Sequence, residues 1–197
     1  MEKMSRIALL ALGAALVAGC DRFAGPKVES PLNGQYRYTC CNIRYEKPEI
    51  SDVNYTQGTL IPYGTRVQIL EVKKNSVRFQ PDGQPEMTLV YRHGRKIYPF
   101  ETYLDRMFLV DDPRRATAAP VGKKKGASKS PSSKFAKQME NGLVEPGMTK
   151  DEVLKTLGYP PAHRTASLDS PVWTYWRNRW ETYVVYFDGD KVDRISR

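Results

Sequence analysis

The sequence predicts an α+β protein that folds as two small domains joined by a linker. Short alternating runs between turn residues fill residues 34–112, which predicts a small mainly-β domain. Residues 135–197 begin with helix-start signals and continue with three alternating runs, which predicts two helices followed by a three-stranded antiparallel sheet. The segment between these regions is basic and has few large apolar residues, so it separates the two predicted domains.

The first region contains a predicted hairpin and a predicted helix. Residues 65–70 and 76–80 alternate between apolar and polar side chains, and the turn-forming residues 73–75 lie between them. Residues 87–91 form a further alternating run. From Pro99 the apolar spacing becomes helical, which predicts a short helix that caps one end of the sheet. The apolar positions of that helix are Phe100, Tyr103, Leu104, Met107 and Phe108.

The stretch from Ile61 to Ile69 resembles the turn and strand of bacterial SH3-like small barrels. This resemblance implies a domain that binds peptidoglycan or a wall protein. It supplies one alternative for the function of the chain.

The second region carries a clear helix-start signal. Thr149 and Glu152 form a capping box, in which the Thr149 hydroxyl accepts from the Glu152 amide and the Glu152 carboxylate accepts from the Thr149 amide. The predicted helix ends at Gly158, and Pro160 prevents its continuation. A shorter helix is predicted near residues 135–139, ahead of this one.

Three alternating runs follow the helices, at residues 172–177, 181–187 and 191–195. A tight Asp-Gly turn at residues 188–189 joins the last two runs as a hairpin. The alternation places Trp173 and Tyr175 on one face of the first strand and Trp176 on the other face. We expect the first face to be the core, because so small a domain needs buried aromatic area.

The motifs of the second region resemble those of the SmpA/OmlA, or BamE-like, lipoprotein domain family. They are Gly147-Met148-Thr149, Leu157-Gly158-Tyr159-Pro160, Trp173-Thr174-Tyr175, Val185-Tyr186-Phe187, Asp188-Gly189 and Val192-Asp193-Arg194-Ile195. The resemblance implies a small domain that assists the β-barrel assembly machinery of the outer membrane, and it implies no catalytic activity. The extra first domain and the long basic linker depart from the familiar members of the family.

The first residues are predicted to be a processing signal. Lys3 and Arg6 precede an apolar stretch that is too short to span a bilayer, and the stretch closes with small residues before Cys20. This arrangement resembles the lipobox of bacterial lipoproteins, which implies cleavage after residue 19, lipidation of Cys20 and a tether over residues 20–33. The resemblance favours the outer membrane, with the protein facing the periplasm. Asp21 leaves retention in the inner membrane open.

The linker is predicted to span residues 113–134, and the whole excess of positive charge lies around it. Residues 114–137 hold eight basic and no acidic side chains, while the chain has a net charge of +9. A basic tract near a membrane anchor is attracted to anionic lipid or lipopolysaccharide, and the candidate contacts are Lys123, Lys124 and Lys125. The alternative is that this charge only keeps the linker extended and soluble. A lipidated, exported chain does not meet nucleic acid.

Composition argues against an enzyme, and no cofactor or metal is expected. The chain has only two histidines, and it shows no Ser/His/Asp arrangement and no phosphate-binding glycine loop. The alternative of a thiol-dependent or metal-dependent enzyme would use the region of Cys40 and Cys41, and a metal site there would take both cysteines with His93 and need a fourth ligand. His93 is interpreted as a solvated turn residue.

The adjacent cysteines Cys40 and Cys41 leave three alternatives open, namely a ring disulfide, a bridge between two chains, or buried thiols. Neighbouring residues point to opposite faces of a strand, so we expect one cysteine in the core and the other exposed.

The candidate recognition surface consists of aromatic and arginine residues outside the predicted core. Tryptophan, tyrosine and arginine are enriched among the residues that dominate binding energy at interfaces. The candidates are Trp176, Arg177, Arg179, Trp180, Tyr186 and Tyr159. The sequence thus predicts a lipid-anchored interaction module of the envelope, with a role in outer-membrane protein assembly or envelope integrity.

Overall fold

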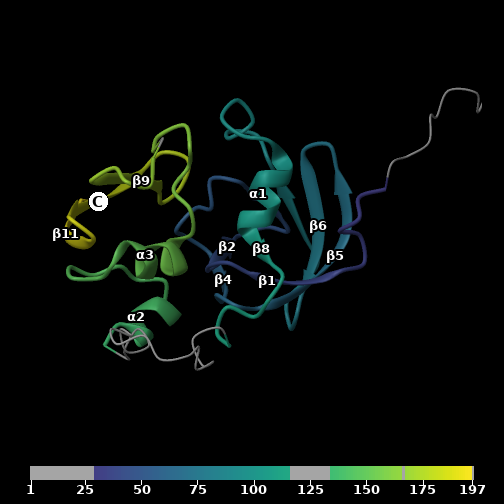
Figure 1. Ribbon diagram of the computed structural model, residues 1–197, viewed down its shortest axis with the longest axis horizontal. Helices are drawn as coiled ribbons and strands as arrows, with labels where there is room; N and C mark the ends of the chain where they lie inside the picture. Colours follow the sequence, from purple (N-terminus) through teal and green to yellow (C-terminus); the bar gives the residue numbers. More distant parts are fainter. Residues whose placement is uncertain (1–28, 116–133, 166, 197) are drawn as a thin grey trace, which may run out of the picture.

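The computed structural model describes residues 29–115, 134–165 and 167–196. The predicted signal peptide, Cys20 and the linker lysines Lys123, Lys124 and Lys125 lie outside these ranges. The two β-rich parts of the described chain lie side by side, with the N-terminal part at one end and the C-terminal part at the other (Figure 1).

A six-stranded sheet with the order β3-β7-β6-β5-β1-β8 forms most of the N-terminal domain, and β2 and β4 pair as a separate two-stranded sheet. The strands are β1 (Tyr36–Thr39), β2 (Ile43–Tyr45), β3 (Glu49–Ser51), β4 (Thr59–Ile61), β5 (Arg66–Lys73), β6 (Ser76–Pro81), β7 (Met87–Val90) and β8 (Phe108–Leu109). One helix, α1 (Phe100–Met107), packs beside the sheet.

The predicted hairpin is confirmed as β5 and β6. Ile69 pairs with Phe79 and Val72 with Val77 in an antiparallel register. Ile69, Phe79 and Val77 are almost fully buried, while the residues between them are at least partly accessible. The period-two alternation therefore assigned the core face of this hairpin correctly.

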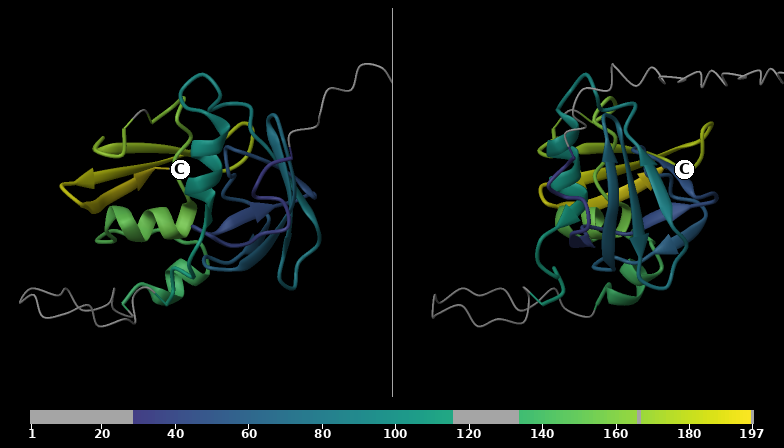
Figure 2. Two further views of the ribbon diagram at one scale, coloured as in Figure 1. Left: turned by 45° about the vertical axis from the view of Figure 1, so that its right-hand side comes forward. Right: turned by 90° about the vertical axis from the view of Figure 1, so that its right-hand side faces the viewer.

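The predicted helix is confirmed as α1, which begins after Pro99, but Phe108, predicted as its last apolar position, lies in strand β8. The buried residues of α1 are Phe100, Tyr103, Leu104 and Met107. Tyr103 stacks on Tyr91 at the end of β7, with a distance of 4.7 Å between the ring centroids. The helix lies between the six-stranded sheet and the C-terminal domain (Figure 2).

Strands β1 to β4 were not predicted, because runs of three or four residues give too little alternation to recognise. Strand β3 is the edge of the large sheet, and it pairs with β7 in parallel. The parallel pair arises because β3 comes from the long connection before the hairpin. No local turn signal could indicate that pairing.

The C-terminal domain has the predicted two helices and three-stranded antiparallel sheet. The elements are α2 (Ala136–Glu140), α3 (Lys150–Leu157), β9 (Val172–Trp176), β10 (Thr182–Asp188) and β11 (Lys191–Ser196), and the sheet order is β11-β10-β9. The capping box of α3 is present, with the Thr149 amide 2.8 Å from the Glu152 carboxylate and the Glu152 amide 3.2 Å from the Thr149 hydroxyl.

The predicted core face of this sheet is confirmed. Trp173, Tyr175 and Val185 are inaccessible to solvent, and Phe187 is nearly so. The Trp173 and Phe187 rings lie 4.7 Å apart between centroids. The Tyr175 hydroxyl donates to the carbonyl of Gly158 at 2.9 Å, and burial holds the pKa of Tyr175 well above its usual value. The aromatic side chains thus join the sheet to the end of α3.

None of the helices in the described part of the chain is long and apolar enough to cross a bilayer.

Candidate functional site

The C-terminal end of α3 is where the two domains join. The last carbonyl groups of an α-helix have no partner within the helix, so they need donors from elsewhere. The Asn42 amide donates to the Lys155 carbonyl at 2.9 Å, and the Asn42 side chain donates to the Thr156 carbonyl at 3.1 Å. The Asn54 side chain donates to the Leu157 carbonyl at 2.7 Å. The N-terminal domain therefore supplies the C-terminal cap of a helix in the other domain.

Asn42 also connects further elements at this junction. Its side chain donates to the Met139 carbonyl of α2 at 2.7 Å and accepts from the Tyr63 amide at 2.8 Å. Asn42 is 3% exposed, so these bonds are shielded from water. Loss of the Asn42 side chain would leave the buried Thr156 carbonyl and the Tyr63 amide without their partner, while the Met139 carbonyl would keep the Gly142 amide at 3.0 Å.

Gly158 allows the domains to approach closely. Its φ of +81° favours glycine, and an added Cβ would lie 2.7 Å from the Asn54 side-chain nitrogen and 3.1 Å from the Cys41 sulfur. The sequence predicted Gly158 as the end of α3. It did not indicate that this glycine contacts the other domain.

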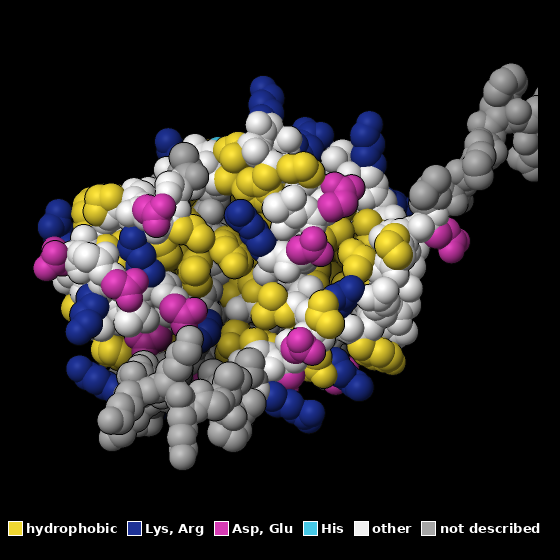
Figure 3. Space-filling model, viewed as in Figure 1, with side chains coloured by type: hydrophobic (Ala, Val, Ile, Leu, Met, Phe, Trp, Pro, Cys, Tyr) yellow, Lys and Arg dark blue, Asp and Glu magenta, His cyan; other side chains and the backbone are white. Residues whose placement is uncertain are grey.

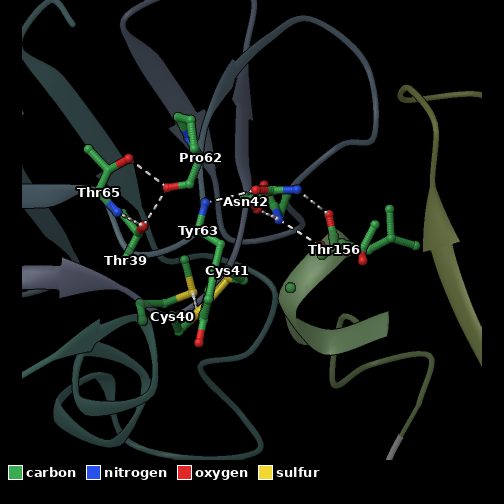
Figure 4. The surroundings of a disulfide bond; sticks show 12 residues. Thr39, Cys40, Cys41, Asn42, Pro62, Tyr63, Thr65 and Thr156 are labelled. Atoms are coloured by element: carbon green, nitrogen blue, oxygen red, sulfur yellow. Dashed lines mark hydrogen bonds between the residues drawn. A yellow bond between two sulfur atoms is a disulfide. The ribbon is translucent and has the colours of Figure 1, made fainter. Parts of the chain in front are cut away.

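Cys40 and Cys41 form a disulfide with each other, immediately before Asn42 (Figure 4). The expectation that they point to opposite faces of a strand was wrong, because β1 ends at Thr39 and the chain bends at residues 40–41. Cys41 is 1% exposed, while Cys40 is half-buried and lies 3.9 Å from the Met107 sulfur. Of the three alternatives for this pair, the structure has the ring disulfide.

A cleft of about 660 Å³ lies between the domains. Ligand sites commonly have volumes of about 300–1,000 Å³. One wall comes from the N-terminal domain, around β2, β3 and the end of β7, and the other wall is the turn between β9 and β10. Its lining residues are Arg44, Tyr45, Glu46, Lys47, Glu49, Ile50, Ser51, Tyr55, Gln57, Val90, Arg92, His93, Arg177, Asn178, Arg179 and Trp180.

Asn178 fixes the β9–β10 turn. Its side-chain oxygen accepts from the amide of Trp180 at 2.8 Å and from the amide of Glu181 at 3.0 Å, which is a common local use of asparagine. The Arg177 amide donates to the Glu181 carbonyl at 2.8 Å. The ordered turn holds Trp180 with 82% of its surface exposed.

Residues 135–197 match the model of the outer membrane protein assembly factor BamE domain. The C-terminal domain is therefore BamE-like, which confirms the resemblance in its sequence motifs. The match begins at the residue before α2 and covers both helices and all three strands of the domain. An assembly factor has an accessory, non-enzymatic role. No curated protein and no solved structure matches the chain.

The cleft beside the BamE-like domain has a positive lining. Five of its residues are lysine or arginine and two are glutamate. Arg92 lies 3.3 Å from Glu49, while Lys47 and Arg179 form no ion pair with any described residue. Arg44 points its guanidinium at the carbonyls of Gly58 and Asn141 at 3.0 and 2.8 Å, and burial lowers its pKa.

The structure brings three of the six candidate recognition residues together. Arg177, Arg179 and Trp180 lie in the cleft. The other three candidates, Trp176, Tyr159 and Tyr186, lie outside it.

The surroundings of Trp176 and Tyr186 explain their positions. Trp176 is half-buried. Its carbonyl accepts from the Thr56 amide of the N-terminal domain at 2.9 Å, and the Arg164 guanidinium lies 5.4 Å from its ring centroid. Tyr186 lies on the outward face of β10, and the Arg194 guanidinium is 4.1 Å from its ring centroid. Tyr159 contacts Arg106 of α1 at the domain boundary, 5.5 Å from ring centroid to guanidinium.

His93 is exposed at a bend, as the sequence suggested, but its ring also has a fixed partner. Its Nδ1 lies 2.9 Å from the buried carboxylate of Asp52, and since a carboxylate only accepts, Nδ1 carries the hydrogen. Asp52 also accepts from the amides of His93 and Gly94, at 2.8 and 3.0 Å. The only other histidine of the chain, His163 of the BamE-like domain, lies 5.4 Å away between ring centroids.

The two histidines meet across the domain boundary, and their environment differs. Burial lowers the pKa of His163, and His93 and Arg164 lower it further. The cavity beside them holds about 10 Å³, which is room for about one water molecule. It is too small for a substrate. The residues that line it include no serine, cysteine or lysine that could act as a nucleophile.

Sequence reasoning missed Asn42, Asp52, Asn54 and His163. Their partners lie more than forty positions away in most cases, so local patterns carry no signal for them. The one usable hint was that the chain has only two histidines. In the described residues no group of three or more histidine, cysteine, aspartate or glutamate side chains could hold a metal ion, and His93 does not join the cysteine pair.

Proposed function

We propose that the protein is a lipid-anchored envelope lipoprotein whose two domains act as one interaction module in outer-membrane protein assembly. The BamE-domain match over residues 135–197 is the observation that carries this proposal. The lipobox-like sequence ending at Cys20 supports the anchor. The bonds of Asn42 and Asn54 to α3 support the joint action of the domains, because they hold one domain to the helix end of the other.

The recognition surface of this module is the cleft between the domains. It combines a highly exposed tryptophan, Trp180, with the arginine side chains of Arg177 and Arg179. Residues of these types supply most of the binding energy at protein interfaces. On the face shown in Figure 3, hydrophobic side chains also gather in the middle of the molecule, where the two domains meet.

The anchor is tested with the variant Cys20→Ala in cells supplied with labelled palmitate. We expect the native chain to take up the label and the variant to take up none. Separation of the inner and outer membranes then shows which membrane holds the labelled protein. Labelling of the variant equal to that of the native chain would contradict the lipid anchor.

The function is tested by affinity capture of the tagged lipoprotein from cross-linked envelopes. We expect components of the β-barrel assembly machinery to be captured by the native chain and to be reduced by Trp180→Ala. Tyr36→Ala is the matched control, because Tyr36 is a 54% exposed aromatic residue outside the cleft lining. Capture of peptidoglycan fragments or wall proteins instead would favour the SH3-like alternative for the N-terminal domain.

A further inference from the structure

We propose that the cleft binds an extended acidic peptide segment of a partner protein, which pairs with the open edge of β3 and packs against Trp180. This inference rests on the proposed function, because it names the chemistry of the recognition surface. Its three supports are the charge of the cleft, the geometry of β3 and the exposure of Trp180.

The positive charge of the cleft favours the binding of an acidic peptide segment. Lys47 and Arg179 line it without an ion pair to any described residue, and they lie on opposite walls. Arg92 and Arg177 have single carboxylate partners at 3.3 and 3.6 Å, and such exposed pairs contribute little energy and exchange readily. Charges of one sign around a cleft attract the opposite sign and reject the same sign.

The open edge of strand β3 favours the binding of an extended peptide over that of a lipid headgroup. The carbonyl of Pro48 accepts from Thr88 of β7 at 2.8 Å, and the amide of Asp52 donates to Val90 of β7 at 3.2 Å. Backbone groups alternate in direction along a strand, so those of Glu49 and Ser51 point away from β7. The Ser51 carbonyl accepts from the Asn54 amide at 3.1 Å, which leaves the amide and carbonyl of Glu49 and the amide of Ser51 along this edge. No strand of the described chain pairs with β3 on that side. An unpaired edge is a template for one more strand.

The edge and the tryptophan face one another across the cleft. Glu49, Ile50 and Ser51 of β3 line it together with Trp180. The Arg179 guanidinium lies 5.8 Å from the Trp180 ring centroid, so the exposed ring and a positive charge are presented as one surface. A strand added to β3 would place alternate side chains toward this surface.

The basic linker of this chain is not the segment that binds in the cleft. Residues 114–137 carry eight basic and no acidic side chains, so a positive cleft repels them. The same charge makes the linker a competing site for an acidic peptide, and the experiment must separate the two.

The probe is a fluorescein-labelled peptide of about ten residues in which glutamate and valine alternate, since alternation suits a strand. Its binding to the mature lipoprotein in neutral detergent is measured by fluorescence anisotropy. We expect binding that weakens with salt, and no binding of the matched peptide of lysine and valine. Trp180→Ala should weaken binding about tenfold or more, as for a residue at the centre of an interface.

Two variants at one position test the pairing with β3. Glu49→Pro removes the outward amide N–H, while Glu49→Ala removes the same carboxylate and keeps the N–H. We expect Glu49→Pro to bind about fivefold more weakly than Glu49→Ala, which corresponds to one net hydrogen bond. Circular dichroism confirms that both variants are folded. Equal affinities would overturn the strand pairing.

A third variant, with Lys123, Lys124 and Lys125 all changed to glutamine, removes much of the charge of the linker. We expect it to keep the affinity of the native chain. Loss of all binding would place the peptide on the linker and overturn the proposal. Binding of vesicles that contain phosphatidylglycerol through Trp180 and Arg179, without binding of the peptide, would make the cleft a membrane contact and overturn it as well. If the peptide binds the cleft but assembly components are not captured, only the proposed function fails.

Discussion

The tryptophans of strand β9 and of the turn that follows it have opposite roles. Trp173 is inaccessible to solvent and packs on Phe187, whereas Trp180 is 82% exposed. We predict that Trp173→Ala lowers the free energy of unfolding by about 3–5 kcal/mol, which is much of the stability of a small domain. Trp180→Ala should change it by less than about 0.5 kcal/mol. Thermal and urea unfolding of both variants measures the difference.

Trp176 provides the control for that comparison, because it lies on the other face of β9 and is half-buried. Its truncation should cost an intermediate amount. Equal destabilisation by all three substitutions would contradict the separation of core and recognition surface.

Single residues also show where sequence reasoning ends. Alternation placed Trp173 and Tyr175 in the core, because the faces of a strand follow from a local period of two. The same argument left Trp176 exposed, and it was incomplete because the alternation could not show that the Thr56 amide binds its carbonyl or that the Arg164 guanidinium lies near its ring. His93 is exposed as expected, but its partners could not be predicted, since Asp52 and His163 are its neighbours only in three dimensions.

At the scale of elements, helix α3 combines a local and a distant determinant. Its N-terminus is set by Thr149 and Glu152, three positions apart, and could be predicted from the sequence. Its C-terminus was predicted from Gly158 alone. The donors that satisfy its last carbonyls, Asn42 and Asn54, belong to the other domain and could not be predicted.

We predict that Thr149→Ala lowers the free energy of unfolding by about 0.5–2 kcal/mol, which is the usual effect of losing an N-cap. Thr149→Ser keeps the hydroxyl and should restore most of the loss. Urea unfolding, followed by the circular dichroism of the helices, measures both variants. Equal stability of the alanine and serine variants would contradict a role for the hydroxyl.

We predict a larger loss for Asn42→Ala, because it removes a donor to the Met139 carbonyl and leaves the buried Thr156 carbonyl and the Tyr63 amide without their partner. Each buried group left without a partner costs about 1–3 kcal/mol. Asn42→Asp has the same shape and keeps the acceptor for the Tyr63 amide, but it directs a carboxylate at those carbonyls. It should therefore be no more stable than the alanine variant. Urea unfolding measures the stability of both variants. Native stability of Asn42→Asp would contradict a role for the Asn42 amide group in holding the domains together.

At the scale of the molecule, the sequence predicted two domains and a basic linker, and the fold class is confirmed. The contact between the domains could not be predicted, because it depends on a few polar residues such as Asn42, Arg44 and Asn54 rather than on an apolar pattern. The cleft is a consequence of that contact. Only the wall with Arg177, Arg179 and Trp180 was therefore indicated by the sequence.

Brief trypsin treatment tests the joint behaviour of the domains. The linker is rich in lysine and arginine, so we predict cleavage between Arg114 and Lys137. Because Asn42 and Asn54 hold α3, the two fragments should still elute together on size exclusion under native conditions. The Asn42→Ala variant should release them. Separate elution of the fragments of the native chain would contradict a stable junction.

We expect the pair of histidines to make the junction sensitive to pH. Burial, His93 and Arg164 all lower the pKa of His163 below its ordinary value of 6.5, and only the Asp52 carboxylate opposes this. A histidine with a lowered pKa binds fewer protons in the folded state than in the unfolded state. The contribution of His163 to the stability of the folded state is therefore complete above about pH 6.5 and is lost as the pH falls below that value.

We predict a lower urea midpoint at about pH 5.5 than at about pH 7.5, and a smaller difference for His163→Gln, which is neutral at both values. His93→Gln is the informative comparison. It removes one cause of the lowered pKa but keeps His163 itself, so the pH dependence should shrink without vanishing. It also removes the Nδ1–H that Asp52 accepts, and its stability at about pH 7.5 gives the size of that separate loss. An unchanged pH dependence in His163→Gln would mean that protonation elsewhere governs the stability, and that the contact between the two histidines is only a packing contact.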